Sequence, residues 1–329
     1  GFRIYFTYLQ QAFAAMTRFI HDSTHSSGIM GKAIAGIKTI LIRLAITWVR
    51  WLERLLPGWA CPGEGKNVFQ LADFLGFLKR NDARFLRESL AYHKTREVIL
   101  ASRQIPFQDH QSKILDIGTG LNPLPVYWAM QGSQVTALDG STYSFAHLKE
   151  VENKARTDSK SICCDYLAGD ARSLPFSSNS LDAITTLCVI EHIPGNGDIE
   201  CMREIHRILR PGGIAVVTVE ASRRYEENWL EVPYPVGYQT GPGERLVQSH
   251  TWNEVFCRNY SPEQVQTRLM ESAHWIVVDT VFYDDRWLPI RRWLDSARRS
   301  PLAFLLRPWQ PLLSLVFYRP VKEGKNLTL

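Results

Sequence analysis

The chain has 329 residues, of which 45% are apolar and 22% charged, so it is long enough to bury a large core and has the composition of a globular protein. Its six cysteines show no C-x-x-C spacing and two of them are adjacent. This favours reduced, buried thiols over a disulfide framework or a zinc site. The formal net charge of +5 is unevenly distributed, because residues 1–56 carry seven Lys or Arg against two acidic residues, and residues 286–311 carry six Arg against one Asp.

Residues 1–60 are predicted to form a basic amphipathic helical extension. Between Lys32 and Leu56 a helical periodicity gathers four basic residues within about 40° of one another, namely Lys32, Arg43, Arg50 and Arg54. The rest of this helix is mainly apolar and includes Trp48 and Trp51, but its charge-free runs are far too short to span a bilayer. The pattern predicts a helix that lies in a membrane interface. The alternative is a helix whose apolar side packs on the protein or on a second subunit.

Residues 61–112 are predicted to form a helical cap with helices at 68–79 and 83–102. Tyr92 and His93 lie on the second helix. From residue 113 to 329, strands alternate with helices, which is typical of a doubly wound, mostly parallel α/β sheet. Seven strands are predicted, at 113–117, 134–139, 163–167, 181–187, 214–220, 276–283 and 315–319. The strand at 181–187 is a continuous apolar and β-branched run, as expected for a strand buried on both faces.

The first of these strands leads into a glycine turn, in the stretch Lys113-Ile-Leu-Asp-Ile-Gly-Thr-Gly-Leu-Asn-Pro123. Gly118 and Gly120 allow a tight turn and a close approach to a ligand. The second strand ends about twenty residues later in Asp139, whose carboxylate can accept hydrogen bonds from both hydroxyls of a ribose. A dinucleotide site is disfavoured, because Pro123 replaces its third glycine and the carboxylate of Asp116 would repel a diphosphate. An ammonium-bearing nucleoside such as S-adenosylmethionine fits better.

Further along the chain stand Gly169-Asp170-Ala171, Glu191-His192 and Leu209-Arg-Pro-Gly-Gly213. With Asp116, the glycine turn and Asp139, they resemble in order and spacing the class I S-adenosylmethionine-dependent methyltransferases, in particular the small-molecule branch that is similar to methyltransferase type 11. The resemblance implies a Rossmann-like sheet and a set of cofactor contacts. Asp116 with Gly118, Thr119 and Gly120 would hold the methionine end, Asp139 and Gly140 the ribose, Asp170 and Ala171 the adenine, and Leu187 would line the methionine end.

The catalytic group is less defined by the sequence. Some relatives bind a divalent metal through E-x-x-E-H after the fourth strand, but here the first position is Cys188, and a thiol is a poor ligand for magnesium. No metal is therefore predicted. His192 is the candidate general base, because imidazole titrates near neutrality. The alternative is that Glu191 and His192 only organise their loop, and His250 and Tyr238 are further candidates.

Two segments of the catalytic domain are unusual in composition. Residues 223–260 are dense in Tyr, Trp, Pro and Gly, and we expect this loop to shape a substrate pocket. Residues 286–311 combine six arginines with three tryptophans and apolar runs, but no lysine. This basic aromatic insert fits anionic lipid headgroups better than nucleic acid.

The expected function is methyl transfer from S-adenosylmethionine to a small, lipophilic or membrane-associated acceptor. One alternative is a methyltransferase of a soluble metabolite or sugar that uses its basic segments to dimerise. Another is a non-enzymatic cofactor-binding scaffold at a membrane. The expected location is cytoplasmic, at the inner face of a membrane if the basic segments bind lipid. The sequence leaves open the acceptor atom, the oligomeric state and whether the N-terminus is complete.

Overall fold

A computed structural model describes most of the predicted core and its cap. The described residues are 29–55, 69–88, 92–107, 111–156, 164–231, 254–278, 280, 283–284 and 319–320. The basic aromatic insert at 286–311, the first 28 residues, and His250 and Tyr238 lie outside them. So do the side chains of Tyr92 and His93.

The centre of the molecule is a five-stranded parallel sheet in the order β3-β2-β1-β4-β5. Its strands are β1 (Lys113–Ile117), β2 (Gln134–Asp139), β3 (Cys164–Ala168), β4 (Leu181–Leu187) and β5 (Leu209–Thr218). Neighbouring residues of β1 face opposite sides, because Ile114 joins one hydrophobic cluster and Leu115 the other. The strand order reverses between β1 and β4, and the carboxyl ends of strands at such a point are where open α/β sheets bind ligands.

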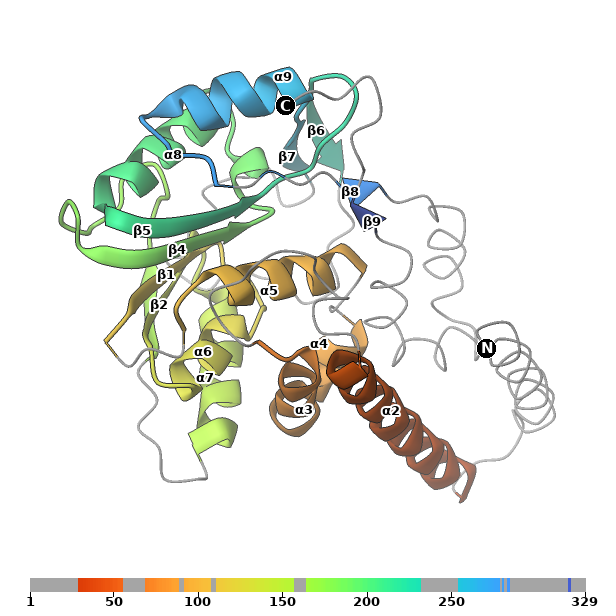
Figure 1. Cartoon of the computed structure of the whole chain (residues 1–329). Helices are drawn as coiled ribbons and strands as arrows, with labels where there is room; N and C mark the ends of the chain where they lie inside the picture. Colours follow the sequence, from red (N-terminus) through yellow and green to blue (C-terminus); the bar gives the residue numbers. More distant parts are fainter. Residues whose placement is uncertain are drawn as a thin grey trace.

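Helices cover both faces of this sheet (Figure 1). The face with Ile114 carries α3 (Leu71–Asn81), α4 (Ala83–Glu88), α5 (Tyr92–Gln104), α6 (Leu124–Met130) and α7 (Tyr143–Ala155). The face with Leu115 carries α8 (Gly197–Ile208) and α9 (Pro262–Gln264), which continues through a π-helical turn, Val265–Leu269, and a 3-10 turn, Met270–Ser272. Ser261 caps α9 by accepting the backbone N–H of Gln264 at 3.3 Å.

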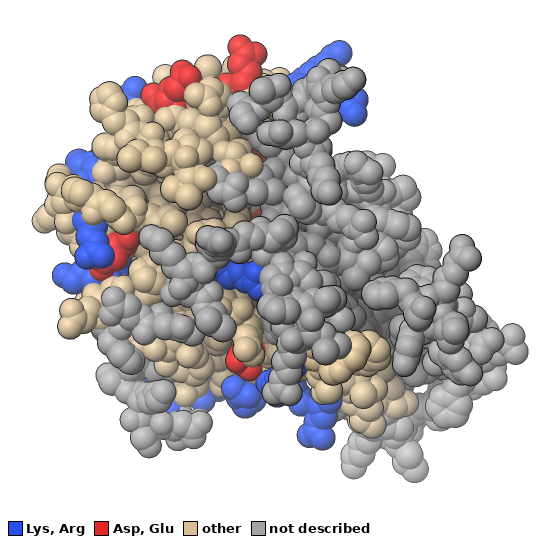
Figure 2. Space-filling model, viewed as in Figure 1, with Lys and Arg blue, Asp and Glu red and all other residues tan. Residues whose placement is uncertain are grey.

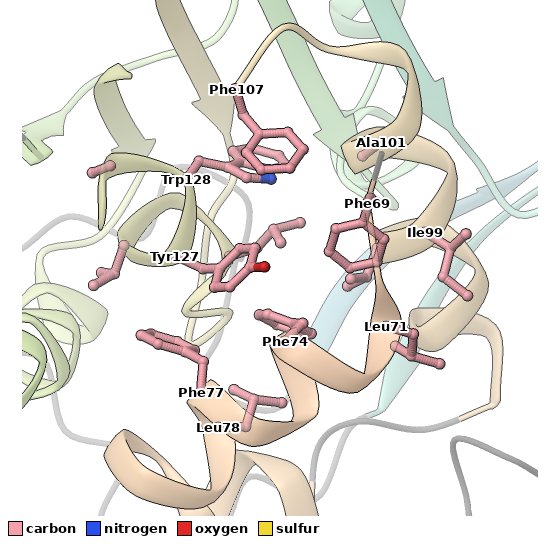
Figure 3. Close-up of a cluster of buried hydrophobic side chains, with 14 of the residues drawn as sticks. Phe69, Leu71, Phe74, Phe77, Leu78, Ile99, Ala101, Phe107, Tyr127 and Trp128 are labelled. Atoms are coloured by element: carbon pink, nitrogen blue, oxygen red, sulfur yellow. The ribbon is translucent and has the colours of Figure 1, made fainter. Parts of the chain in front are cut away.

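The cap helices share one core with the sheet (Figure 3). Phe74 and Phe77 of α3 stack with their ring centroids 6.1 Å apart, and Tyr127 of α6 meets them edge-on at 5.2 and 5.4 Å. The indole N–H of Trp128 is buried, and it donates to the Ser102 hydroxyl of α5 at 3.1 Å. Because burial of these aromatic rings is favourable at about 25 cal/mol per Å² of apolar surface, the cap is fixed to the sheet.

Of the seven predicted strands, five form this sheet, and within the described residues the sixth and seventh are not part of it. Of the predicted strand at 276–283, residues 276–278 and 280 are not in a strand, and Ile276 and Val278 are 91% and 81% exposed instead of packing on the sheet edge. Tyr283–Asp284 (β8) instead pairs antiparallel with Arg319–Pro320 (β9) in a separate two-stranded sheet. The fifth strand begins at Leu209, earlier than predicted, so the glycines of the Leu209–Gly213 turn lie inside it.

The loop predicted at 223–260 contains a second antiparallel pair. It is formed by β6 (Glu226–Glu231) and β7 (Glu254–Asn259). Arg258 of β7 is fully buried and donates to the backbone carbonyls of Ile193 (3.2 Å) and Gly195 (2.7 Å). These two hydrogen bonds attach the β6–β7 strand pair to the loop that follows β4.

The N-terminal helix α2 (Ile29–Leu55) packs on α3 and only part of its apolar surface faces outward. Leu41, Ile42, Ala45 and Val49 are buried, whereas Ile40, Leu44, Trp48 and Trp51 are exposed. The guanidinium of Arg50 forms an ion pair with Asp73 of α3 at 3.2 Å. Part of the apolar face therefore packs on the protein, as in the alternative, and the exposed part forms an apolar stripe. Of the helices within the described residues, none combines the length and apolar character needed to cross a bilayer.

Candidate functional site

The glycine turn after β1 is closed on one side and open on the other. Gly118 and Gly120 adopt φ angles of +69° and +52°, which L residues with a side chain rarely take. A Cβ on Gly118 would lie 2.4 Å from the side chain of Val189, which follows β4. A Cβ on Gly120 would meet nothing within 4 Å. The turn thus presents Gly120 to open space at the edge of the sheet.

Asp139, at the carboxyl end of β2, holds this turn in place. Its Oδ2 accepts the backbone N–H of Gly120 at 2.8 Å, and its Oδ1 accepts that of Ser141 at 3.0 Å. Burial raises the pKa of Asp139, and the N–H groups of Gly120, Ser141 and Gly140 oppose that shift. A carboxylate beside an open glycine turn is well placed to accept the hydroxyls of a ribose.

Asp116 lies beneath the turn. Asp116 is only 3% exposed, and its two carboxylate oxygens accept hydrogen bonds from the hydroxyls of Thr119 (2.8 Å) and Thr185 (2.5 Å). Burial raises the pKa of Asp116 to about 6, against the effect of these two hydrogen bonds. The geometry makes Asp116 a support of the turn, and its contact with a ligand stays a prediction.

Asp170 and Ala171 follow β3, on the outer side of β2. Arg172 binds the Asp170 carboxylate, with Nη2 at 2.6 Å from Oδ2 and Nε at 3.0 Å from each oxygen. This pairing holds the pKa of Asp170 below its ordinary value. Ala171 is buried. A ligand amine at Asp170 would therefore share the carboxylate with Arg172.

At the carboxyl end of β4, Leu187 and Cys188 meet helix α5. The ammonium of Lys94 pairs with Glu97 Oε2 at 2.5 Å and donates to the Leu187 carbonyl at 3.3 Å. The thiol of Cys188 donates to Glu97 Oε1 at 3.1 Å. Cys188 has a φ of +56°, which is rare for a residue with a side chain. Burial opposes the charge of Lys94, but Glu97, Cys188 and Glu191 together outweigh it, so the pKa of Lys94 is raised.

Glu191 and His192 follow in a short 3-10 turn. Glu191 is fully buried, its Oε1 accepts the N–H of Glu220 at 3.3 Å, and its Oε2 has no hydrogen-bond partner among the described residues. Burial raises the pKa of Glu191 to about 8. His192 Nδ1 lies 2.8 Å from the Phe256 carbonyl, which can only accept, so Nδ1 carries the proton. Burial lowers the pKa of His192, which leaves a neutral ring whose Nε2 can accept a proton.

The comparisons with known proteins agree with this geometry. Residues 115–217 match the family model described as a methyltransferase domain. The matched range contains the glycine turn, Asp139, Asp170 and the Glu191–His192 pair. The chain contains a class I S-adenosylmethionine-dependent methyltransferase domain.

The relatives of this methyltransferase domain include enzymes named for different methyl acceptors. Cycloartenol-C-24-methyltransferase of Arabidopsis thaliana is 34% identical over 137 residues, which cover 41% of this chain and 38% of the relative. Demethylmenaquinone methyltransferase of Renibacterium salmoninarum is 34% identical over 105 residues, covering 32% of this chain and 40% of the relative. The chain thus spans less than half the length of these curated relatives. A solved S-adenosylmethionine-dependent methyltransferase of Aquifex aeolicus is similar with a TM-score of 0.36 and 17% identity, over 65% of this chain and 92% of that one.

Sequence reasoning missed two groups at the candidate site, the Lys94–Glu97 pair and Thr185. In the sequence, Lys94 and Glu97 read as a solvated pair one helical turn apart. Only the contacts of α5 with Leu187 and Cys188, at the end of β4, show that Glu97 is buried there. Thr185 reads as one more β-branched residue of a buried strand. Its bond to Asp116 depends on the pairing of β1 with β4, which aligns these two residues directly.

Metal ligands do not gather in the part of the chain that the structure describes. Among those residues, no three His, Cys, Asp or Glu side chains are grouped as a metal site would need. Metal independence stays a prediction, and it rests on Cys188 at the position where some relatives have a carboxylate.

Proposed function

We propose that this protein transfers a methyl group from S-adenosylmethionine to a small, lipophilic acceptor. The observation that carries the cofactor assignment is the Gly120 turn, open to space and held by the carboxylate of Asp139 at 2.8 Å. No glycine-rich, phosphate-binding helix start accompanies it, since the residue that caps α6 is Pro123, which has no backbone N–H to donate. The site favours a nucleoside with a cationic tail over a dinucleotide. When bound, S-adenosylmethionine supplies an already activated methyl group, so the protein mainly aligns the acceptor and excludes water.

The exposed stripe of α2 supports a lipophilic acceptor held at a membrane. Ile40, Leu44, Trp48 and Trp51 are 57%, 47%, 38% and 51% exposed, and the two indoles meet edge-on with centroids 5.5 Å apart. Arg43 borders this stripe, and basic side chains lie beside uncharged surface where α2 is seen (Figure 2). Exposed tryptophans with flanking arginines are typical of helices in the interface of anionic membranes.

The names of the relatives point the same way. Cycloartenol is a sterol and demethylmenaquinone a lipid quinone, and the enzymes named for them are among the similar proteins. The family model matches residues 115–217, and α2 and α5 lie outside this range. We infer that these two helices adapt a common cofactor site to an acceptor that partitions into lipid. The proposed location is the inner face of a membrane, with the insert at 286–311 as a second point of contact.

Labelled methyl transfer tests this proposal. The full chain is incubated with S-adenosylmethionine labelled in the methyl group and a bacterial total lipid extract in vesicles, and label is counted in the organic and aqueous phases. We expect label in the organic phase that Asp139→Ala reduces. A parallel assay replaces the lipid extract with an extract of water-soluble metabolites. Label found only in the aqueous phase of this assay would support the soluble-acceptor alternative. Cofactor binding without transfer to either extract would support the scaffold alternative.

A further inference from the structure

We propose that Glu97 of α5 receives the proton that a hydroxyl acceptor loses during methyl transfer, with Lys94 holding its carboxylate in place. This inference rests on the proposed function. It adds a catalytic residue from a helix that lies outside the residues matched by the methyltransferase family. It also competes with His192, the base expected from the sequence.

The position of Glu97 is the first argument. Its carboxylate contacts Cys188 and, through Lys94, the carbonyl of Leu187, which closes β4. Asp116, beneath the glycine turn of β1, also interacts with Lys94. The Lys94–Glu97 pair therefore lies between the ends of β1 and β4, where the strand order reverses and ligands of such sheets bind. His192 is bound to β7 through its Nδ1, at the Phe256 carbonyl, and it also interacts with Lys94.

The hydrogen bonding of Glu97 is the second argument. Glu97 is 7% exposed, and a buried carboxylate normally accepts hydrogen bonds from strong donors. Oε2 has such a donor in the ammonium of Lys94. Oε1 has the thiol of Cys188 at 3.1 Å, and a thiol is a weak donor. The O–H of an acceptor would be a stronger partner for Oε1 than this thiol.

The charges of the neighbouring groups are the third argument. Glu191 interacts with Glu97, and burial together with nearby carboxylates makes Glu191 hard to ionise. Glu97 has the ammonium of Lys94 as a direct partner, whereas Glu191 has none among the described residues, where its Oε2 is unpaired. The two carboxyls therefore differ in their partners: Glu97 has a cation within hydrogen-bond distance that holds it in place, and Glu191 has an oxygen without a partner among the described residues.

The chemical step balances without another reactant. A lone pair of the acceptor oxygen forms the new bond to the methyl carbon, and the bond from that carbon to the sulfonium breaks with both electrons passing to sulfur. The O–H bond of the acceptor breaks with its electrons staying on oxygen, and its proton passes to Oε1 of Glu97. The products are the methyl ether, S-adenosylhomocysteine and a protonated Glu97, which releases its proton to solvent between turnovers.

Four variants of the full chain test the assignment, with the same labelled donor and lipid extract. Glu97→Gln keeps the shape but cannot accept a proton, and Glu97→Asp keeps a carboxylate. His192→Asn tests the competing base. Glu150→Gln is the matched control, because Glu150 also pairs with a lysine of its own helix, Lys154, at 2.6 Å, but on the exposed surface of α7. S-adenosylhomocysteine affinity is measured by calorimetry for each variant.

We expect Glu97→Gln to lower kcat at least about 100-fold, in the range that general bases contribute, with affinity for S-adenosylhomocysteine within about twofold. Glu97→Asp should retain more activity than Glu97→Gln, and Glu150→Gln should match the wild type. Lys94→Met should move the acid limb of the kcat profile to higher pH, because loss of the ammonium favours the protonated carboxyl.

Two results would overturn the inference. One is Glu97→Gln with near wild-type kcat beside an inactive His192→Asn. The other is an equal loss in both Glu97 variants together with lost S-adenosylhomocysteine affinity, which would show a purely structural role. Either result leaves the proposed function standing, since wild-type transfer is scored separately. Absence of wild-type transfer would instead reject the proposed function.

Discussion

The backbone N–H of Gly120 donates to the carboxylate of Asp139 at 2.8 Å, which joins two sequence motifs nineteen residues apart. The first motif turns the chain after β1 and the second ends β2. Since β1 and β2 are adjacent and parallel, both motifs reach the same edge of the sheet. Asp139 therefore has two functions in the proposed site: it orders the turn, and it faces the place of the ribose.

Asp139→Ala should weaken binding of S-adenosylmethionine by about 1–3 kcal/mol, because the ribose hydroxyls lose their acceptor. Part of the loss comes from the turn, since the N–H of Gly120 also loses its partner. Calorimetry of the wild type and the variant measures the change. Glu150→Ala, on the exposed surface of α7, serves as the control and should bind as the wild type does. Unchanged affinity in Asp139→Ala would contradict the assignment.

The two glycines of the turn should respond differently to alanine. Gly118→Ala should destabilise the fold, because its Cβ would lie 2.4 Å from Val189 in addition to the strain at a φ of +69°. Overpacking of this kind costs about 1–3 kcal/mol and left-handed backbone about 1–2 kcal/mol. Gly120→Ala meets no neighbour, so it should cost only the backbone term, and it should reduce cofactor affinity by filling the open side of the turn.

Urea unfolding and calorimetry of both variants check this difference. The double variant Gly118→Ala with Val189→Ala should recover most of the stability that the contact cost. If Gly118→Ala and Gly120→Ala lose equal stability, the closed and open sides of the turn are wrongly assigned.

Glu191 should make the folded protein less stable as the pH rises. Its pKa is about 8 in the folded state against an ordinary value of 4.5, so between these values the folded protein binds a proton that the unfolded chain has released. Stability therefore falls as the pH rises through this window. Between pH 6.5 and 8.5, above the pKa of about 6 of Asp116, the Tm of the wild type should fall more than that of Glu191→Gln. Parallel slopes in the two proteins would rule out this role for Glu191.

The exposed stripe of α2 should bind anionic vesicles. Trp48→Ser with Trp51→Ser should reduce co-sedimentation at low salt, because burial of apolar surface is worth about 25 cal/mol per Å². Ile276→Ser with Val278→Ser removes apolar side chains that are also exposed, at 91% and 81%, and should leave binding unchanged. A wild type that stays in the supernatant would favour α2 as a subunit interface.

Charge reversal on the basic segments should also release the protein from vesicles. The residues are Arg43 and Arg50 of α2 together with Arg291 and Arg292 of the insert, each worth about 1 kcal/mol near an anionic surface. Arg50 also pairs with Asp73, but both side chains are about half exposed, so loss of this pair should not unfold the protein. Release should be mimicked by added salt. Binding that resists both salt and charge reversal would show that these arginines do not contact headgroups.

Methyl transfer should survive exhaustive chelation, because Cys188 stands where some relatives place a metal-binding carboxylate. The measurement is labelled transfer after treatment with EDTA, with and without added magnesium. Loss of activity on chelation and its return with magnesium would show that a metal is required.

The cofactor edge was largely predictable from the sequence because local patterns determine it. The ranges of β1, β2 and β4 are confirmed, and Gly118 and Gly120 do adopt the backbone conformation that favours glycine. The sheet edge was not predictable, since Ile276 and Val278 have strand-like sequence but stay exposed, with no strand beside them among the described residues. Glu97 was missed for a similar reason: its burial depends on where α5 meets β4, which no local pattern encodes.

Calorimetric titration of the full wild-type chain with S-adenosylmethionine, and separately with NAD, tests the central claim most directly. The open turn at Gly120, the carboxylate of Asp139 and Pro123 at the start of α6 favour the first ligand and exclude the diphosphate of the second. We expect saturable binding of S-adenosylmethionine and of S-adenosylhomocysteine at one site per chain, and no heat with NAD. Binding of NAD, or no binding of S-adenosylmethionine, would contradict the account.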